Sequence, residues 1–229
     1  MTAHATSLDE LVQPHIVDAD EAFTRHYERG LALTGMHDNA WRRPRFYHLA
    51  QMFALTRGVP GATAEAGVYR GLASYVLCQM RRAEDPSFDG SGHVAIDSFE
   101  GLSEPTQADE RPEYAGRFAD TSLELARRSL ADFPGATLVK GWIPEAFGAL
   151  PEQQYRFAHV DVDLHDPTMD SLAYFYPRLS AGGILLVDDY GPWPNGDFPG
   201  CKRAVDTFAS QHTLPLAVLD TGNAVLFKR

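Results

Sequence analysis

Apolar residues occur along the chain in two spacings, one typical of buried strands and the other of amphipathic helices. Short, nearly continuous apolar runs predict strands, because a strand that is buried on both faces does not alternate with polar residues. These runs occupy residues 63–68, 93–99, 137–142, 157–164 and 184–187. Helical stripes lie between them, so strand and helix signals alternate from residue 63 onward.

Helices are predicted where apolar side chains recur three and four residues apart. Asp166 followed by Pro167 predicts a helix start with Asp166 as N-cap, and Gly182 with Gly183 predicts that this helix closes before the strand at 184. The predicted helices lie within 121–133 and at the stripes Phe46, Leu49, Ala50, Phe53; Ala73, Val76, Leu77, Met80; Met169, Leu172, Ala173, Tyr176; and Cys201, Ala204, Val205, Phe208.

The last 14 residues predict a β-hairpin. Two short apolar runs, 216–219 and 224–227, flank the turn residues 220–223. Five strand–helix units followed by a hairpin predict an α/β fold with a mostly parallel sheet and one antiparallel strand, which binds its ligands at the carboxyl ends of the strands. Two long irregular segments, 101–117 and 191–200, lie on that side, where loops of such length are usually functional.

Composition narrows the class of protein. A chain of 229 residues with 44% hydrophobic residues supports one α/β domain, expected over residues 19–229, with a helical cap over 19–60 and a flexible arm over 1–18. A net charge of −11 argues against nucleic acid as a partner. No apolar run approaches the roughly 20 residues that span a bilayer. With two cysteines and no apolar leader, we expect a cytoplasmic protein that binds a small molecule.

Acidic residues gather where two of the predicted strands end. Asp161 and Asp163 follow one apolar run, and Asp188 and Asp189 follow another. Neighbouring carboxylates raise one another's pKa unless a positive charge lies among them, and a divalent cation such as Mg²⁺ binds oxygen ligands of this kind. Strand periodicity places Asp161 and Asp163 on one face, whereas Asp188 and Asp189 can share a ligand only if their strand has ended. Alternatively, Asp163 caps the loop before the next helix, and one member of the Asp188–Asp189 pair is solvated.

The first strand is followed by a turn that contains Gly67 and Gly71, which allow close approach of the backbone to a ligand. The third glycine of a dinucleotide fingerprint is absent, and Glu65 suits a ligand with an amino group better than a pyrophosphate. Asp97 ends the second strand, where this class of fold places a carboxylate for ribose hydroxyls. Together these residues favour a nucleoside ligand, and the alternatives are an ordinary tight turn and a solvated Asp97.

Five motifs resemble the macrocin-type O-methyltransferases, which are class I S-adenosylmethionine (SAM) enzymes of antibiotic and sugar biosynthesis. The motifs occupy residues 65–71, 97–102, 161–172, 176–183 and 187–191, and the resemblance covers about residues 63–210. It implies a Rossmann-like sheet of seven strands. It also implies a SAM site at Glu65, Gly67 and Asp97, and an Mg²⁺ site at Asp161, Asp188 and Asp189.

Two substitutions depart from the family pattern, Tyr69 in place of a tryptophan and His165 in place of a tyrosine. The segment before residue 63 is short for a substrate lid, which leaves open a lid from a second subunit of a homo-oligomer. By position in this fold, Ser98 and Trp142 join Tyr69 and Gly71 in the expected cofactor site.

We therefore predict a SAM-dependent, Mg²⁺-dependent O-methyltransferase that acts on a hydroxylated sugar or natural product. Asp161 is the candidate proton acceptor, and His165 is a second candidate base or a plain hydrogen-bonding histidine. His159 and Cys201 read as buried structure. The aromatic loop residues Tyr190, Trp193 and Phe198 could line the acceptor site or pin the loop. The competing functions are a nucleotide-linked oxidoreductase and a non-catalytic module that binds SAM or another metabolite.

Overall fold

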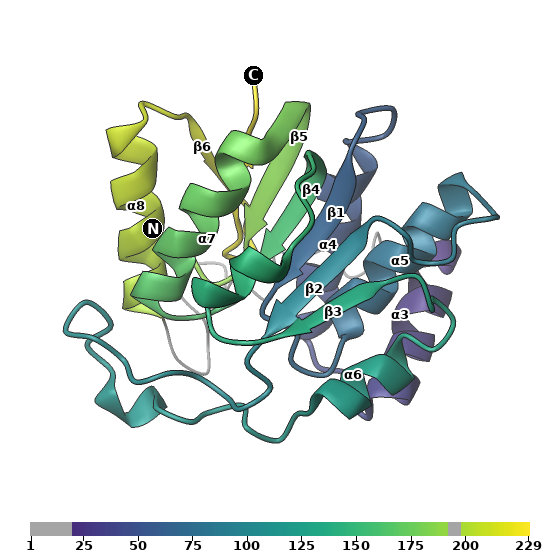
Figure 1. Cartoon of the computed structure of the whole chain (residues 1–229), viewed down its shortest axis with the longest axis horizontal. Coiled ribbons are helices and arrows are strands. Elements are labelled where there is room, and N and C mark those ends of the chain that lie inside the picture. Colours follow the sequence, from purple (N-terminus) through teal and green to yellow (C-terminus); the bar gives the residue numbers. More distant parts are fainter. Residues whose placement is uncertain (1–19, 192–197) are drawn as a thin grey trace, which may run out of the picture.

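The computed structural model describes residues 20–191 and 198–229, which form a three-layer α/β/α arrangement around one sheet (Figure 1). The sheet contains seven strands in the order β3-β2-β1-β4-β5-β7-β6. Only β7 runs antiparallel to its neighbours, β5 and β6, so the predicted hairpin is confirmed. The strands are β1 (Ala62–Ala66), β2 (His93–Asp97), β3 (Thr137–Lys140), β4 (Tyr155–Val160), β5 (Leu179–Val187), β6 (Leu216–Val218) and β7 (Ala224–Phe227).

Helices cover both faces of the sheet, each through an apolar stripe. On one face, Leu49 and Phe53 of one helix and Leu77 of the next pack on Phe157 and Ile184 of the central strands. On the other face, the last two helices, α7 (His165–Arg178) and α8 (Pro199–Gln211), bury their stripes against the same strands. The helices are α3 (Glu21–Thr34), α4 (Arg42–Ala54), α5 (Leu72–Glu84), α6 (Leu123–Ser129), α7 (His165–Arg178) and α8 (Pro199–Gln211), with short 3-10 turns η1 (Pro112–Tyr114) and η2 (Glu145–Ala149).

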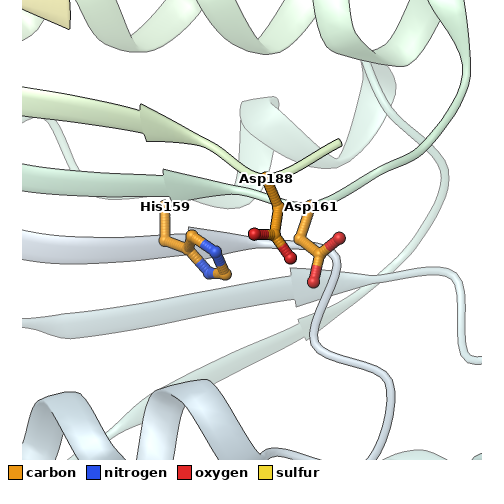
Figure 2. A group of neighbouring side chains, drawn as sticks. All are labelled: His159, Asp161 and Asp188. Carbon is orange, nitrogen blue, oxygen red and sulfur yellow. The ribbon is translucent and has the colours of Figure 1, made fainter. Parts of the chain in front are cut away.

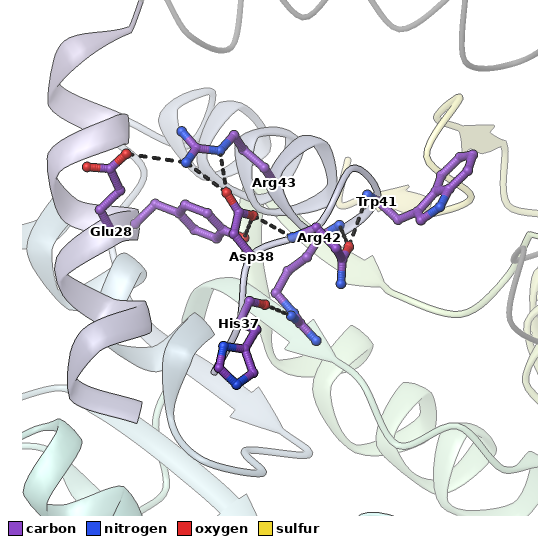
Figure 3. A network of polar contacts seen from close by, with 8 residues as sticks. Glu28, His37, Asp38, Trp41, Arg42 and Arg43 are labelled. Atoms are coloured by element: carbon purple, nitrogen blue, oxygen red, sulfur yellow. Dashed lines mark hydrogen bonds and ion pairs between the residues drawn. The ribbon is translucent and has the colours of Figure 1, made fainter. Parts of the chain in front are cut away.

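A polar network holds the corner between α3 and α4 (Figure 3). Asp38 lies in the connecting loop, and its Oδ1 accepts a hydrogen bond from the Tyr27 hydroxyl at 2.8 Å. Its Oδ2 accepts from Arg43 Nε at 2.9 Å, and Arg43 also lies 3.3 Å from Glu28 on α3. The Arg42 guanidinium donates to the His37 carbonyl. These contacts position the first turn of α4, which carries Arg45 toward the sheet.

The strands end earlier than the apolar runs suggested. β4 stops at Val160, and Asp163 adopts a left-handed φ of 62°, so Asp161 and Asp163 lie in a loop and strand periodicity does not relate them. The expectation that they share a face for that reason was wrong. β5 ends at Val187, so the condition set for Asp188 and Asp189, that their strand has ended, is met.

The boundaries around α7 also differ from the prediction. The helix begins at His165 with Leu164 at the N-cap, and the backbone N–H of His165 donates to Asp109 Oδ1 at 2.7 Å. A carboxylate from a distant loop therefore caps the helix, and Asp166 lies in its first turn. Gly182 and Gly183 do not close the helix, because β5 already begins at Leu179. Gly182 donates to the Lys228 carbonyl and thus takes part in the pairing with the chain end.

The predicted arm over 1–18 and Trp193 lie outside the described residues. Among the residues that the structure describes, no helix is long and apolar enough to cross a membrane.

Candidate functional site

A pocket of about 430 Å³ opens at the carboxyl ends of the parallel strands. It lies at the switch point of the sheet. There β1 stands between β2, which follows it in the chain, and β4, which comes later. Loops that follow β1 to β5 and the first turns of α4 line it. Of the residues predicted from the sequence, the lining includes Glu65, Gly67, Tyr69, Asp97, Ser98, Trp142, Asp161, Asp188 and Asp189.

The turn after β1 is held open by Asp97. One carboxylate oxygen accepts hydrogen bonds from the backbone N–H groups of Val68 at 2.7 Å and Tyr69 at 2.8 Å, and the other accepts from Phe99 at 2.6 Å. Burial raises the pKa of Asp97, and these backbone donors act against that rise. Gly67, Tyr69 and Gly71 all adopt positive φ, which curls the turn around the carboxylate. Asp97 therefore has a local structural role that the sequence did not reveal.

Glu65 is buried at the floor of the pocket and ends a chain of hydrogen bonds. The Ser74 hydroxyl donates to Glu65 Oε2. Because that hydroxyl has one proton, it accepts from Nε2 of His93, 2.9 Å away, and Nδ1 of His93 then accepts from Thr63 Oγ1 at 2.8 Å. Burial lowers the pKa of His93 to about 3, so this ring is neutral. The chain fixes the Glu65 carboxylate as an acceptor toward the pocket.

The acidic residues follow the ends of β4 and β5, and Glu65 lines the same pocket. Ligand atoms of Asp161, Asp163 and Asp189 all lie within 4.8 Å of one another, and so do those of His159, Asp161 and Asp188. Figure 2 shows the last three side chains projecting from neighbouring strand ends to the same side of the sheet. Such a donor set, rich in carboxylate oxygens and partly open to a pocket, fits a hard divalent cation. His159 is buried, as expected, and its Nδ1 lies 3.4 Å from Glu65 Oε1.

The electrostatics of this cluster are those of crowded carboxylates. Burial and the charge of Asp189 raise the pKa of Asp161 well above its usual value, and the same two causes act on the pKa of Asp163. Arg45 opposes the rise at both residues. Its guanidinium contacts Asp188 through Nε at 3.2 Å and lies 3.3 Å from Asp189 Oδ1 through Nη2. Nothing in the spacing of α4 marked Arg45, because the periodic signal there comes from the apolar stripe.

Asp188 also belongs to a second chain of hydrogen bonds that the sequence did not predict. The Asn223 amide donates to Asp188 Oδ1, and Asn223 Oδ1 accepts from the Thr221 hydroxyl at 2.6 Å. Thr221 Oγ1 lies 2.7 Å from His48 Nδ1, which must then be the donor. The turn of the terminal hairpin, predicted only as a connection, thus supports the acidic cluster, and Asn223 and Arg45 both donate to Asp188 Oδ1.

The remaining predicted residues fall into two groups. Trp142 lines the pocket and is 42% exposed. Phe198 also lines the pocket and contacts Tyr114 in a tilted arrangement, with the ring centroids 5.1 Å apart. Tyr190 turns away, since its hydroxyl donates to Asp206 at 2.8 Å. His165 Nδ1 lies 2.6 Å from Asp166 Oδ1, and His165 is not among the described residues that line the pocket. Gly71 is not among the described residues that line the pocket, and a Cβ atom there would face Ser129 of α6 at 3.5 Å. Cys201 is buried, in agreement with the sequence reading.

Comparison with known proteins gives concordant matches. The family model described as macrocin O-methyltransferase matches residues 32–229. The mycinamicin III 3''-O-methyltransferase of Micromonospora griseorubida is 30% identical over 172 residues, which cover 69% of this chain and 64% of that protein. The demethyldecarbamoylnovobiocin O-methyltransferase of Streptomyces niveus is 31% identical over 163 residues, which cover 67% and 60%. The match thus spans less than two thirds of either relative.

Solved structures agree on the fold. The O-methyltransferase NovP superposes with a TM-score of 0.67 at 25% identity, covering 80% of this chain and 79% of NovP. The calicheamicin methyltransferase CalS11 superposes with a TM-score of 0.69 at 22% identity, covering 89% and 91%. Together with the strand order, these structures confirm the predicted class I methyltransferase fold.

Proposed function

Because the chain belongs to the macrocin O-methyltransferase family, we propose that it transfers a methyl group from SAM to a hydroxyl group of a sugar-bearing small molecule. The observation that carries the proposal is the pocket itself. It joins a glycine turn suited to a nucleoside with a buried carboxylate cluster suited to a divalent cation. Relatives whose names specify methylation of mycinamicin III and of demethyldecarbamoylnovobiocin support the substrate class.

The cofactor would lie along the glycine turn. Glu65 offers its fixed carboxylate to the amino group of the methionine part, Asp97 and Ser98 lie at the end of β2 for the ribose, and Trp142 offers a ring for the adenine. Gly67 and Gly71 give the backbone its close approach, with Tyr69 between them. Asp97 can accept one further hydrogen bond at Oδ1 while it holds the turn, because a carboxylate oxygen has two lone pairs and the Phe99 N–H uses only one of them.

Asp161, Asp188 and Asp189 would hold Mg²⁺, with Asp163 close enough to adjust the charge of the site. When bound, SAM supplies an electrophilic methyl group, and Mg²⁺ lowers the pKa of a hydroxyl group that it binds. Asp161 faces the pocket and would accept the proton of that hydroxyl group. Burial raises its pKa, which makes the deprotonated carboxylate a stronger base than an exposed one. His165 is left out of this set because its imidazole faces Asp166.

The acceptor is proposed to carry two neighbouring hydroxyl groups. A metal held by a few carboxylates keeps positions for other oxygen ligands, so a diol can occupy two of them. Phe198, with Tyr114 packed against it, gives the pocket an apolar wall for an aglycone. We further propose that the chain forms a homo-oligomer in which a second subunit completes the lid. We also propose a cytoplasmic location.

The decisive experiment measures methyl transfer from labelled SAM to matched glycosides with and without the second hydroxyl group. Each reaction is run with EDTA and with Mg²⁺. NAD(P)H oxidation is followed in parallel, because it would reveal the competing oxidoreductase activity. We expect activity to vanish in EDTA and return with Mg²⁺, and Asp161→Asn to lower kcat by about 100-fold or more. Asp206→Asn, an exposed change on α8, is the control. Full activity in EDTA excludes the metal role, and kcat/KM within about threefold for the deoxy acceptor excludes chelation through two oxygens.

A further inference from the structure

Arg45 connects the helical layer to the carboxylate cluster. It leaves the first turn of α4 and places its guanidinium between Asp188 and Asp189, which are 143 and 144 residues away in sequence. Nη2 contacts both carboxylates and Nε contacts Asp188 as well. Asp188 and Asp189 side chains are only 7% and 4% exposed, whereas that of Arg45 is 22% exposed and lines the pocket.

These contacts use the oxygen atoms that a divalent cation would need. Each of the two candidate ligand sets contains one member of this pair, Asp188 in one and Asp189 in the other. A guanidinium donates hydrogen bonds along the lone pairs of a carboxylate, and a metal ion binds through the same lone pairs. A guanidinium and a metal ion on the same carboxylate also repel each other, because both are positively charged, and the repulsion is stronger away from bulk water. Arg45 in its present position and a bound cation therefore compete for these carboxylates.

We propose that Arg45 is an internal counter-ion that competes with a divalent cation for Asp188 and Asp189, so that metal binding displaces the Arg45 side chain into the pocket. The inference rests on the proposed function only through the metal site. It assigns Arg45 two effects of opposite sign, stabilising the metal-free protein and weakening the affinity for the metal.

The surrounding structure allows the side chain alone to move. Helix α4 is anchored by Leu49 and Phe53 in the core, so its backbone need not shift. Asp188 keeps a hydrogen bond from Asn223, which is itself buried and joined to Thr221, when the guanidinium leaves. The carboxylate is therefore oriented from the hairpin side whether or not Arg45 contacts it.

The test is a titration of the full chain with Mn²⁺, followed by electron paramagnetic resonance of the free ion. We expect Arg45→Gln to bind Mn²⁺ at least about tenfold more tightly than the wild type, which is a reasonable effect of removing one charge at contact distance. Arg45→Lys keeps the positive charge but loses the planar set of N–H donors of the guanidinium. Its affinity for Mn²⁺ should therefore lie between those of the wild type and Arg45→Gln. Arg57→Gln removes an exposed charge just beyond the same helix, where Arg57 lies near Glu84 rather than Asp188 or Asp189, so its affinity should stay within about twofold of the wild type.

A second measurement separates competition from damage to the fold. In EDTA, Arg45→Gln should unfold at a lower temperature than the wild type, and saturating Mn²⁺ should shrink that difference. Weaker or unchanged Mn²⁺ affinity in a folded Arg45→Gln protein would overturn the role of Arg45 while leaving the metal site in place. Absence of Mn²⁺ binding in both proteins would overturn the inference together with the metal part of the proposed function. A measurement of SAM binding would then test the cofactor part of the proposed function separately.

Discussion

Gly67 shows how one residue fixes the geometry of the site. A Cβ atom at this position would lie 1.8 Å from the carbonyl oxygen of Asp161, and the φ of 87° strains any other residue. Gly67→Ala must therefore push β1 and β4 apart where the carboxylate cluster begins. We expect a loss of about 3 kcal/mol or more in the free energy of unfolding, measured by urea denaturation.

Gly148→Ala is the matched control, because a Cβ atom there meets nothing within 4 Å. It should change the free energy of unfolding by no more than about 0.5 kcal/mol. Equal stability of the two variants would mean that the close approach of Gly67 to Asp161 is not a constraint.

His93 predicts a dependence of stability on acid. Its folded pKa of about 3 lies below the ordinary value of 6.5, so between these values the unfolded chain binds a proton that the folded protein does not. This residue therefore costs stability as pH falls below 6.5, at up to about 1.4 kcal/mol per pH unit. His93→Gln should remove that slope. The difference in free energy of unfolding between the wild type and His93→Gln, measured by urea denaturation, should therefore shrink from pH 7 to pH 5.

His212→Gln, at an exposed histidine, controls for the substitution itself. If the wild type and His93→Gln lose stability in parallel on acidification, the buried chain from Thr63 to Glu65 does not hold His93 neutral.

At the scale of elements, the segment 101–117 is fastened to α7 by Asp109. This buried carboxylate caps the helix at His165 and accepts from the backbone and hydroxyl of Thr106 at 2.7 and 3.0 Å. Asp109→Ala leaves those donors without partners, so we expect a loss of about 1–3 kcal/mol in the free energy of unfolding. The loosened segment should raise the KM for the acceptor more than the Kd for SAM. Glu104→Ala, at an exposed position on the same segment, should change neither the free energy of unfolding nor the acceptor KM. An unchanged acceptor KM in Asp109→Ala would show that the contact between this segment and α7 does not shape the acceptor site.

At the scale of the whole molecule, SAM binding should stabilise the fold independently of the metal. Loops from several strands form the cofactor side of the pocket, so a ligand there binds only the folded chain. At 100 times its Kd, SAM should add about 2.7 kcal/mol, a rise in Tm of several degrees, with or without EDTA. A folded Asp97→Ala protein should lose most of this rise, and the exposed change Asp132→Ala should keep it. A full rise in Asp97→Ala would remove Asp97 from the ribose site.

The sequence by itself determined the order and type of the elements, because strand and helix periodicities are local properties of the chain. It also placed Asp161, Asp188 and Asp189 at one edge, since parallel strands that each end in a carboxylate bring those ends together. The hairpin and the glycine turn likewise follow from residues that are neighbours in sequence.

Tertiary structure decided what joins distant segments. Asp109 caps a helix 56 residues away, and Arg45 reaches carboxylates more than 140 residues away, and no spacing along the chain encodes such pairs. The turn residue Asn223 supports Asp188 only because β7 lies beside β5. Strand ends were misplaced for a related reason. Apolar runs continue past the last ladder hydrogen bond, and the left-handed turn at Asp163 is set by packing rather than by hydrophobic pattern.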